Sequence, residues 1–443
     1  MKKYVLILAA AMLCGAILLL FKGGKEASLE PDADDMRYRL NDSLCNALSD
    51  LQSTEKMERY IRNWMARNSI RGASLAVMKN EHLVYCKGFG WADEERNIPA
   101  EVGDIYRIAS ASKLITAIGI MKMCDEGMLT LDTKVFGPDG ILNDPQFTEI
   151  KDKRAEQITV RQLLNHTSGF SRRLGDPMFR TTDIMRWEDM DHTPSADELI
   201  AFQLRQKLRD RPGGAPQYSN IGYLVLSRVI EKVSGLSYEE YIQRHVLWPA
   251  GCYDMHIARN YYEERFPHEV KYYGSDPDDE IESFDGSGRM KPRHYGGNNI
   301  TGLQGAGAWV CSAVELLRLV ASVDGKAGVP DILSPQSVDE MKRIARKGDY
   351  ALGWARYNSK TGSLVRTGTM SGTCAYIESR GNTSYVFITN TSHYRGASFT
   401  NAIGRMVQTA MSKVTEWPAD RDLFVAVPHD TPAQDGDGCG GIS

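Results

Sequence analysis

A serine and a lysine three residues apart, in the run Ser110-Ala-Ser-Lys113, have the types and spacing for nucleophilic catalysis. Residues three apart on a helix lie on one face, so the hydroxyl and the amine can meet. A serine needs a neighbouring base to become a nucleophile, and a lysine serves if it loses its charge. Lowering a lysine pKa from about 10.4 to about 7.5 corresponds to about 4 kcal/mol, which burial and a neighbouring cation can supply.

A tyrosine and an asparagine form the second pair, in the run Pro212-Gly-Gly-Ala-Pro-Gln-Tyr218-Ser-Asn220. This loop is rich in glycine and proline and leads directly into a segment with helical apolar spacing. A loop held against the start of a helix can direct both side chains into a cleft. Alone, Tyr218 is better explained as a core tyrosine whose hydroxyl is satisfied.

The third group is the run Arg366-Thr367-Gly368-Thr369, which lies in a segment rich in β-forming residues. Gly368 allows a substrate to approach the backbone, and Arg366 contributes a fixed positive charge. Alone, Arg366 is explained as a surface arginine on a strand. The joint occurrence of the three groups, in this order along the chain, favours a serine hydrolase.

The elements that must position these residues follow from periodicity and turn residues. We expect helices over residues 37–68, 110–126, 223–234 and 400–411, and strands over residues 72–78, 82–89, 363–369, 373–379 and 384–390. Strands at both ends of the sequence around a helical middle predict an α+β fold. Its antiparallel sheet is built from both ends of the chain and flanked by helices, with a mostly helical second lobe. Residues 176–194 and 261–299 are expected as long loops that rim a cleft.

The amino terminus resembles an export signal or a membrane anchor. Two lysines precede the uncharged stretch 4–21, which is longer than most secretory signals, so we favour an uncleaved anchor over a cleaved signal peptide. We expect residues 1–22 to be this signal or anchor and 23–36 a linker. The hydrolase domain is expected over 37–417 and a flexible tail over 418–443. The domain would then be extracytoplasmic, periplasmic or at the cell surface, and tethered to the membrane by residues 4–21.

The composition and the missing motifs argue against several classes of protein function. The chain has 443 residues, 42% hydrophobic and 25% charged, with a net charge of -4 and no long basic run, so nucleic acid is not an expected partner. The eight cysteines include no C-x-x-C pair, and we expect small buried hydrophobes and a free Cys439 rather than disulfides or a zinc site. The nine histidines are dispersed without an H-E-x-x-H motif, and we expect no metal and no cofactor. No G-x-S-x-G motif supports an α/β-hydrolase.

The three groups resemble the signature of the penicillin-recognising serine hydrolases, which is S-x-x-K, then Y-x-N, then K-T-G or H-x-G. The likeness is greatest to the branch of class C β-lactamases, D-Ala-D-Ala carboxypeptidases and β-lactamase-like esterases. It extends from about residue 55 to 412. The runs that carry it are Tyr106-Arg-Ile-Ala-Ser-Ala-Ser-Lys113, Gln162-Leu-Leu-Asn-His-Thr-Ser-Gly169, Tyr218-Ser-Asn-Ile-Gly-Tyr-Leu-Val-Leu226 and Gly305-Ala-Gly-Ala-Trp-Val310.

The resemblance implies a role for each matching residue. Ser110 would attack a carbonyl and form an acyl-enzyme, while Lys113 and Tyr218 pass the proton to the leaving group. Asn220 would hold the substrate amide. The backbone N–H groups of Ser110 and Thr369 would form the oxyanion hole. His166 would shape the site without taking protons.

One position departs from the family pattern, because Arg366 stands where lysine or histidine is usual. A guanidinium keeps the charge and can grip a carboxylate, but it cannot pass a proton near neutral pH. This leaves the deacylation route open. The expected partner is a small-molecule or peptide substrate, with cell-wall peptide included. A peptidase is the first expectation, an esterase the second and a β-lactamase the third. The alternative is a slow or non-catalytic cell-wall sensor that keeps the pocket.

Overall fold

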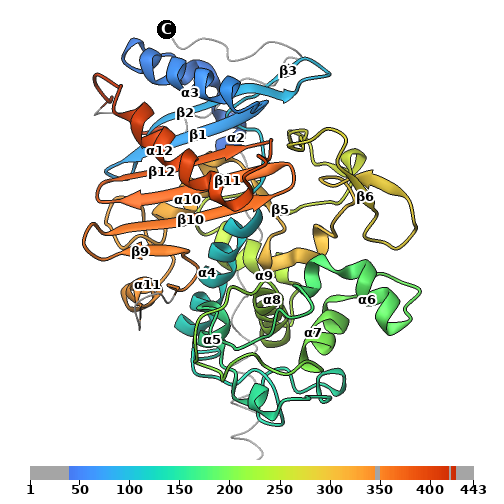
Figure 1. Ribbon diagram of the computed structural model, residues 1–443. Helices are drawn as coiled ribbons and strands as arrows, with labels where there is room; N and C mark the ends of the chain where they lie inside the picture. Colours follow the sequence, from blue (N-terminus) through green and yellow to red (C-terminus); the bar gives the residue numbers. More distant parts are fainter. Residues whose placement is uncertain (1–38, 345–349, 419–420, 426–443) are drawn as a thin grey trace, which may run out of the picture. The chain divides into compact units, whose positions relative to one another are not determined.

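The structure is a computed structural model that describes residues 39–344, 350–418 and 421–425 (Figure 1). The chain divides into two units, residues 1–36 and 37–443. The predicted anchor at 4–21 and the linker at 23–36 lie outside the described residues. Within the described ranges, no helix has both the length and the apolar character needed to cross a membrane.

A seven-stranded antiparallel sheet joins the two ends of the domain, which confirms the fold predicted from the sequence. The strands lie in the order β3-β2-β1-β12-β11-β10-β9. β1 pairs with β12, with Val77 opposite Tyr385. The bounds are β1 (Gly72–Lys79), β2 (His82–Asp93), β3 (Ile98–Pro99), β9 (Arg356–Asn358), β10 (Ser363–Met370), β11 (Thr373–Arg380) and β12 (Thr383–Thr389).

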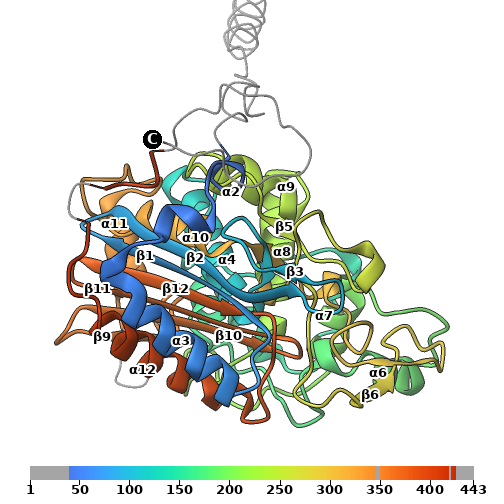
Figure 2. The ribbon, with the colours of Figure 1, turned by 90° about the horizontal axis from the view of Figure 1, so that it is seen from above.

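Helices cover both faces of this sheet (Figure 2). Successive side chains of a strand point to opposite faces, and along β1 Leu75 and Val77 pack into one apolar cluster while Ala76 and Met78 pack into the other. The first face carries α3 (Glu55–Arg67) and α12 (Phe399–Met411), and the second carries α4 (Ser112–Asp125) and α10 (Ala313–Ala321). Because both faces are covered, β1 is a continuous buried run of small and apolar residues.

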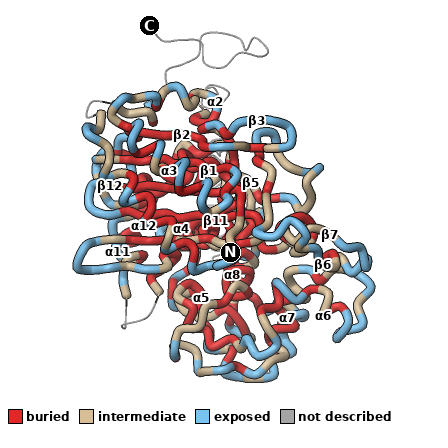
Figure 3. Tube along the Cα trace, turned by 45° about the horizontal axis from the view of Figure 1, so that its top comes forward, coloured by how far each residue is buried: buried red, intermediate tan, exposed pale blue. Residues whose placement is uncertain are grey.

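The second lobe is mostly helical and lies beyond α4 (Figure 1). Its helices are α5 (Val160–Leu164), α6 (Thr181–Glu188), α7 (Ala196–Leu204), α8 (Ile221–Ser234), α9 (Tyr238–Ile242) and the π-helical turn η8 (Gln243–Leu247). The central helix α8 is largely buried (Figure 3). It ends where predicted, at Gly235, whose φ of 74° is the left-handed conformation that glycine adopts without strain.

Smaller elements complete the domain. Two small sheets are formed by β4 (Tyr106–Arg107), β8 (Trp309–Cys311) and β5 (His256–Ile257), and by β6 (Glu280–Glu282) and β7 (Met290–Pro292). The domain also contains helix α11 (Pro335–Lys342). Short 3₁₀ turns are η4 (Ala109–Ala111), η5 (Pro145–Phe147), η6 (Lys153–Gln157), η9 (Tyr262–Glu264), η10 (Thr301–Ala306) and η11 (Gly396–Ser398).

The predicted helix 37–68 is wrong in its first half. A long helix begins only at Glu55, and before it come the one-turn helix α2 (Leu40–Ser43) and the 3₁₀ turns η2 (Asn46–Ser49) and η3 (Gln52–Thr54). The reason is that polar side chains here bind the backbone of β2. Ser49 Oγ accepts from the Cys86 N–H at 3.0 Å, and Asn46 Oδ1 accepts from the Gly88 N–H at 2.7 Å.

Two predicted loops and the predicted tail also contain more order than expected. Residues 176–194 include the 3₁₀ turn η7 (Pro177–Phe179), which Asp176 caps, and helix α6, which buries Ile184 and Met185. Residues 261–299 include the β6–β7 hairpin. In the expected tail, the Leu423 N–H donates to Leu83 O at 2.9 Å and Phe424 is buried, so residues 421–425 pack beside β2.

The cysteine prediction requires one correction, because Cys45 is disulfide-bonded. Cys86, Cys252, Cys311 and Cys374 are free and buried, as expected for small core residues, and Cys124 is free and half-buried. Cys14 and Cys439 lie outside the described residues.

Candidate active site

Ser110 lies in the 3₁₀ turn η4, which runs directly into helix α4. The preceding residue, Ala109, has a φ of 48°, which is uncommon for a residue with a side chain and marks a sharp turn before the serine. Strand β10 packs against this turn. A Cβ on Gly368 would come within 1.9 Å of the Ile108 carbonyl oxygen, so only glycine fits there.

Arg366 reaches across from β10 to the backbone of the serine. Its side chain is 1% exposed, and its Nε donates to the Ser110 carbonyl oxygen at 2.8 Å, with Nη2 donating to the same oxygen. This contact was not anticipated from the sequence. A buried charge with two bonds to one acceptor holds that backbone position firmly.

Lys113 is fully buried beneath the serine. Its Nζ donates to Asn220 Oδ1 at 2.7 Å, to the Ala306 carbonyl and to Ser110 Oγ at 3.5 Å. Burial lowers the pKa of Lys113, and Arg366 lowers it further, whereas Tyr218 and Asp176 oppose the change. The structure therefore brings together residues that are distant in the sequence. It places the Lys113 amine 3.5 Å from the Ser110 hydroxyl.

Tyr218 contacts the nucleophile directly. Its hydroxyl donates to Ser110 Oγ at 2.8 Å. Burial by itself would raise the tyrosine pKa, but the charges of Lys113 and Arg366, together with hydrogen bonds, lower it to about 8. Among the described residues in contact with Ser110, Tyr218 thus combines a short hydrogen bond with a pKa close to neutrality.

His166 holds the loop that carries Tyr218. Its carbonyl oxygen accepts from the Gln217 N–H at 2.8 Å, and its Nδ1 accepts from the Ser219 N–H at 3.2 Å. Its ring packs 4.5 Å from the Tyr218 ring. Burial, followed by the charges of Lys113 and Arg366, lowers the pKa of His166 well below its usual value, so the imidazole is neutral. The two backbone bonds on either side of Tyr218 account for its orientation.

Asp176 belongs to this site, and the sequence interpretation missed it. Its carboxylate accepts from Asn220 Nδ2 at 2.9 Å and from the Asn220 N–H at 3.2 Å. Because Nδ2 is bound to Asp176, the amide presents Oδ1 to Lys113. The Asp176-Pro177 pair is a recognisable start of a helical turn, but it carries no sign of a contact with Asn220.

These residues surround a cleft of about 480 Å³ between the two lobes of the domain. Six of the predicted site residues line it, namely Ser110, Tyr218, Asn220, Arg366, Thr367 and Thr369. Lys113 is buried below the cleft and Gly368 is packed against Ile108. Additional lining comes from the segments predicted to rim the cleft, with Phe179 from the first and Arg293 and Asn298 from the second.

Strand β10 presents an open edge to the cleft. It pairs with β9 only from Ser363 to Val365, so the edge beyond Val365 has no strand beside it. The Ala355 N–H donates to the Val365 carbonyl, so the backbone groups of Val365 point away from β11. Orientation alternates along a strand, and Thr369, four residues later, therefore points its N–H to the open side. This is the direction that an oxyanion donor at Thr369 requires.

No group of three or more His, Cys, Asp or Glu side chains that could hold a metal ion occurs in the described part of the chain.

Known proteins share sequence with this chain. Residues 57–406 match the sequence model of the family described as Beta-lactamase. Protein flp of Staphylococcus aureus (strain NCTC 8325 / PS 47) is 30% identical over 197 residues, which are 44% of this chain and 37% of that protein. Penicillin-binding protein 4* of Bacillus subtilis (strain 168) is 27% identical over 302 residues, 66% of this chain and 61% of that protein. The matches thus span less than two thirds of either relative.

Solved structures share the fold. The octameric penicillin-binding protein homologue from Pyrococcus abyssi has a TM-score of 0.59 and 24% identity, covering 84% of this chain and 79% of that chain. The D-amino acid amidase from Ochrobactrum anthropi SV3, in complex with D-phenylalanine, has a TM-score of 0.62 and 22% identity, covering 82% of this chain and 99% of that chain.

The fold is that of the β-lactamase and penicillin-binding-protein type. The chain belongs to the Beta-lactamase family, as its match over residues 57–406 shows. This membership confirms the resemblance found in the sequence and supports a serine hydrolase.

Proposed function

We propose that this protein is a serine hydrolase that forms an acyl-enzyme at Ser110 on small peptide or amide substrates. The observation that carries the proposal is the 2.8 Å contact between the Tyr218 hydroxyl and Ser110 Oγ, with the Lys113 amine buried beneath both. The contact joins a nucleophile to a group that can take its proton, and the cleft offers the space that a carbonyl substrate needs.

In this proposal Tyr218 accepts the Ser110 proton directly. The three hydrogen-bond partners of the Lys113 amine are all acceptors, so a protonated Lys113 satisfies each of them and stabilises a Tyr218 phenolate. Ser110 Oγ then bonds to the substrate carbonyl carbon, and its proton passes through Tyr218 to the leaving amine as the amide bond breaks. Water releases the acyl group by the same path. Arg366 contributes a positive charge and takes no proton.

We rank the possible substrates with peptides or amides first, esters second and β-lactams third. The names of the Bacillus subtilis relative and of the amidase neighbour support this order, because they describe a penicillin-binding protein and a D-amino acid amidase. The apolar segment 4–21 supports an extracytoplasmic location with a membrane tether and therefore access to cell-wall peptide.

Covalent labelling tests the proposal. A fluorophosphonate probe should label the unmodified protein once, and intact mass should place the adduct on Ser110. Ser110→Ala should abolish labelling, whereas Ser371→Ala, which removes another hydroxyl lining the same cleft, should leave it unchanged. Equal labelling of the Ser110→Ala protein would overturn the assignment. Labelling without turnover of D-Ala-D-Ala peptides, short-chain esters or a chromogenic cephalosporin would favour the slow sensor.

A further inference from the structure

A second pocket, of about 690 Å³, shares no lining residue with the catalytic cleft. Stretches of chain that are distant in the sequence form it, from residues 67–71, 262–295 and 391–394 and from Glu95. Five of the chain's twenty tyrosines line it, namely Tyr262, Tyr272, Tyr273, Tyr295 and Tyr394. We propose that this tyrosine pocket binds a neutral saccharide, the sugar part of a glycan-linked peptide substrate. The peptide part of the inference rests on the proposed serine hydrolase function.

Tyr273 forms a fixed surface of the tyrosine pocket. Its hydroxyl accepts from the Glu94 N–H and donates to Glu95 Oε2, both at 2.8 Å. Its backbone N–H donates to Asn390 O at 2.9 Å, and its carbonyl oxygen accepts from the Ser392 N–H at 3.1 Å. A ring held at all these points is already ordered, so a ligand that stacks on it does not have to restrict its motion.

Tyr394 lies at the rim of the same pocket and is 82% exposed. Its ring lies 4.3 Å from the His393 ring, which in turn stacks on Phe399 at 3.9 Å. The exposed ring is therefore supported from behind and open to solvent in front. A tyrosine presents an apolar body and a polar tip, and a sugar ring likewise has apolar C–H faces and a polar edge. The two surfaces are complementary.

Free polar groups lie beside these rings. Within the described chain, three serine hydroxyl groups of the lining have no hydrogen-bond partner, those of Ser69, Ser275 and Ser392. Lys271 Nζ lies 5.2 Å from the centre of the Tyr273 ring and pairs with Glu95 at 2.7 Å, so a donor and an acceptor flank the ring. A few polar groups among aromatic ones are what orients a small ligand, and sugar hydroxyl and N-acetyl groups both donate and accept.

The charges of the lining do not favour an ionic ligand. Lys271 pairs with Glu95, and Arg71 pairs with Glu94 at 3.0 Å. The third cation of the lining, Arg67, is the last residue of α3, where the helix dipole favours a positive charge. An ionic ligand would have to compete with these partners, whereas a neutral polar ligand would not. The tyrosine pocket therefore suits a neutral saccharide.

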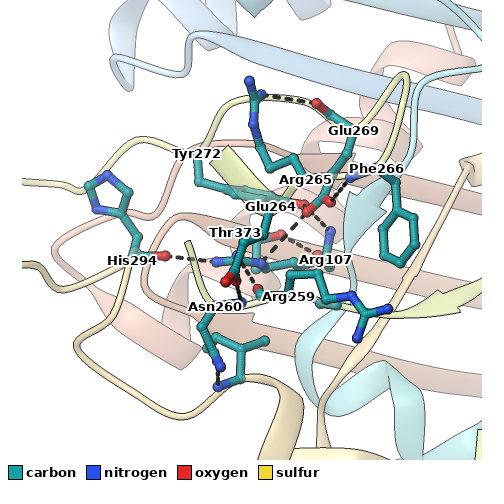
Figure 4. A network of polar contacts seen from close by, with 12 residues as sticks. Arg107, Arg259, Asn260, Glu264, Arg265, Phe266, Glu269, Tyr272, His294 and Thr373 are labelled. Atoms are coloured by element: carbon teal, nitrogen blue, oxygen red, sulfur yellow. Dashed lines mark hydrogen bonds and ion pairs between the residues drawn. The ribbon is translucent and has the colours of Figure 1, made fainter. Parts of the chain in front are cut away.

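A single stretch of chain separates the tyrosine pocket from the catalytic cleft. His294 lines the pocket and Arg293, the preceding residue, lines the cleft. The buried Arg107 supports this wall, because its Nη1 donates to His294 O at 2.7 Å and its backbone N–H donates to the Tyr272 hydroxyl at 2.8 Å (Figure 4). Arg107 also lies three residues before Ser110. We therefore expect a substrate bound at Ser110 to extend over this wall into the pocket.

Binding of the N-acetylglucosamine tetrasaccharide to the full-length protein tests the pocket, measured by saturation-transfer NMR and calorimetry. Ser110→Ala should bind it as well as the unmodified protein, because binding needs no hydrolysis. Ser275→Trp fills the pocket and should abolish binding, and Tyr394→Ala should weaken it about 3- to 10-fold, the range for one aromatic contact. Ser287→Trp and Trp187→Ala alter exposed residues outside the pocket and should leave binding unchanged.

A matched pair of peptides tests the link to the substrate. A peptide that ends in D-Ala-D-Ala is compared with the same peptide carrying the tetrasaccharide at its amino end. The saccharide-bearing peptide should protect Ser110 from fluorophosphonate labelling at a concentration about 10-fold lower, because two linked contacts reinforce each other. Ser275→Trp should remove this difference.

Three results would contradict the inference. No binding of the tetrasaccharide, or binding that Ser275→Trp leaves intact, would overturn the assignment of the pocket. Equal protection by the two peptides would overturn its part in substrate binding. Failure of the fluorophosphonate to label Ser110 would instead overturn the proposed function.

Discussion

The Tyr218 hydroxyl lies 2.8 Å from Ser110 Oγ, closer than the 3.5 Å that separates this oxygen from the Lys113 amine. The sequence suggested Lys113 as the base because its spacing from Ser110 is fixed by a single helical turn. The structure instead places the phenol in direct contact with the nucleophile, with the lysine supporting both groups from below. This arrangement determines how each variant should behave.

The pH dependence of acylation should follow Tyr218. With a pKa lowered to about 8, Tyr218 is protonated below this pH and cannot take the serine proton. The acylation rate should therefore rise as the pH increases through about 8 and level off above it. Tyr218→Phe should reduce the acylation rate by a factor of about 10² to 10⁴ and abolish its rise near pH 8. A stopped-flow profile of labelling from pH 6 to 10 measures both, and an unchanged profile in the phenylalanine variant would refute the assignment.

Lys113→Ala should reduce acylation by at least about 100-fold, because Tyr218 loses the cation that stabilises its deprotonated form. Lys113→Arg should fail as badly. The buried space beneath Ser110 accommodates one nitrogen with three acceptors, and the planar guanidinium fork has a different shape. Labelling rates, with circular dichroism to verify folding, measure the effect. A folded arginine variant with near-normal rates would contradict this role.

Asp176→Ala should lower acylation by about 10-fold or more. Without the carboxylate, Asn220 Nδ2 loses its acceptor and the amide can turn its NH₂ group towards Lys113, where two donors face each other. Asp176→Asn retains an acceptor and should recover most of the rate. Recovery of the acylation rate in the asparagine variant would show that Asp176 acts by orienting Asn220 and that its negative charge is not needed. If both variants lose activity equally, the charge itself matters.

Gly368→Ala should destabilise the protein by about 1 to 3 kcal/mol and impair labelling, because the added methyl group collides with the Ile108 carbonyl beside the nucleophile. Gly222→Ala is the matched control, since its Cβ would meet nothing closer than 3.5 Å and alanine favours a helix interior. Thermal unfolding compares the two. Equal melting temperatures for both variants would show that β10 tolerates a side chain at this contact.

Local patterns predicted most of the elements. The five predicted strands and the helices after Ser110 and Asn220 form as expected, since alternation and helical spacing of apolar residues report directly on burial. Residues 37–54 and 176–194 were misjudged for a different reason. Asn46 and Ser49 bind the β2 backbone through single polar side chains, which leave no periodic pattern. Helix α6 has only eight residues, and its buried residues Thr181, Ile184 and Met185 are too few to stand out among polar neighbours.

The sequence by itself determined the chemistry, because Ser110 and Lys113 lie one turn apart and Tyr218 and Asn220 share one short loop. Only the tertiary structure decided how these groups are used. In the folded chain Arg366 binds the Ser110 carbonyl and Asp176 binds Asn220. Arg293 lines the cleft. Each contact joins residues from separate parts of the chain, 44 residues apart for Asp176 and Asn220 and 256 for Ser110 and Arg366. Contacts of this kind are set by the packing of segments that are distant in the sequence, on which local spacing carries no information.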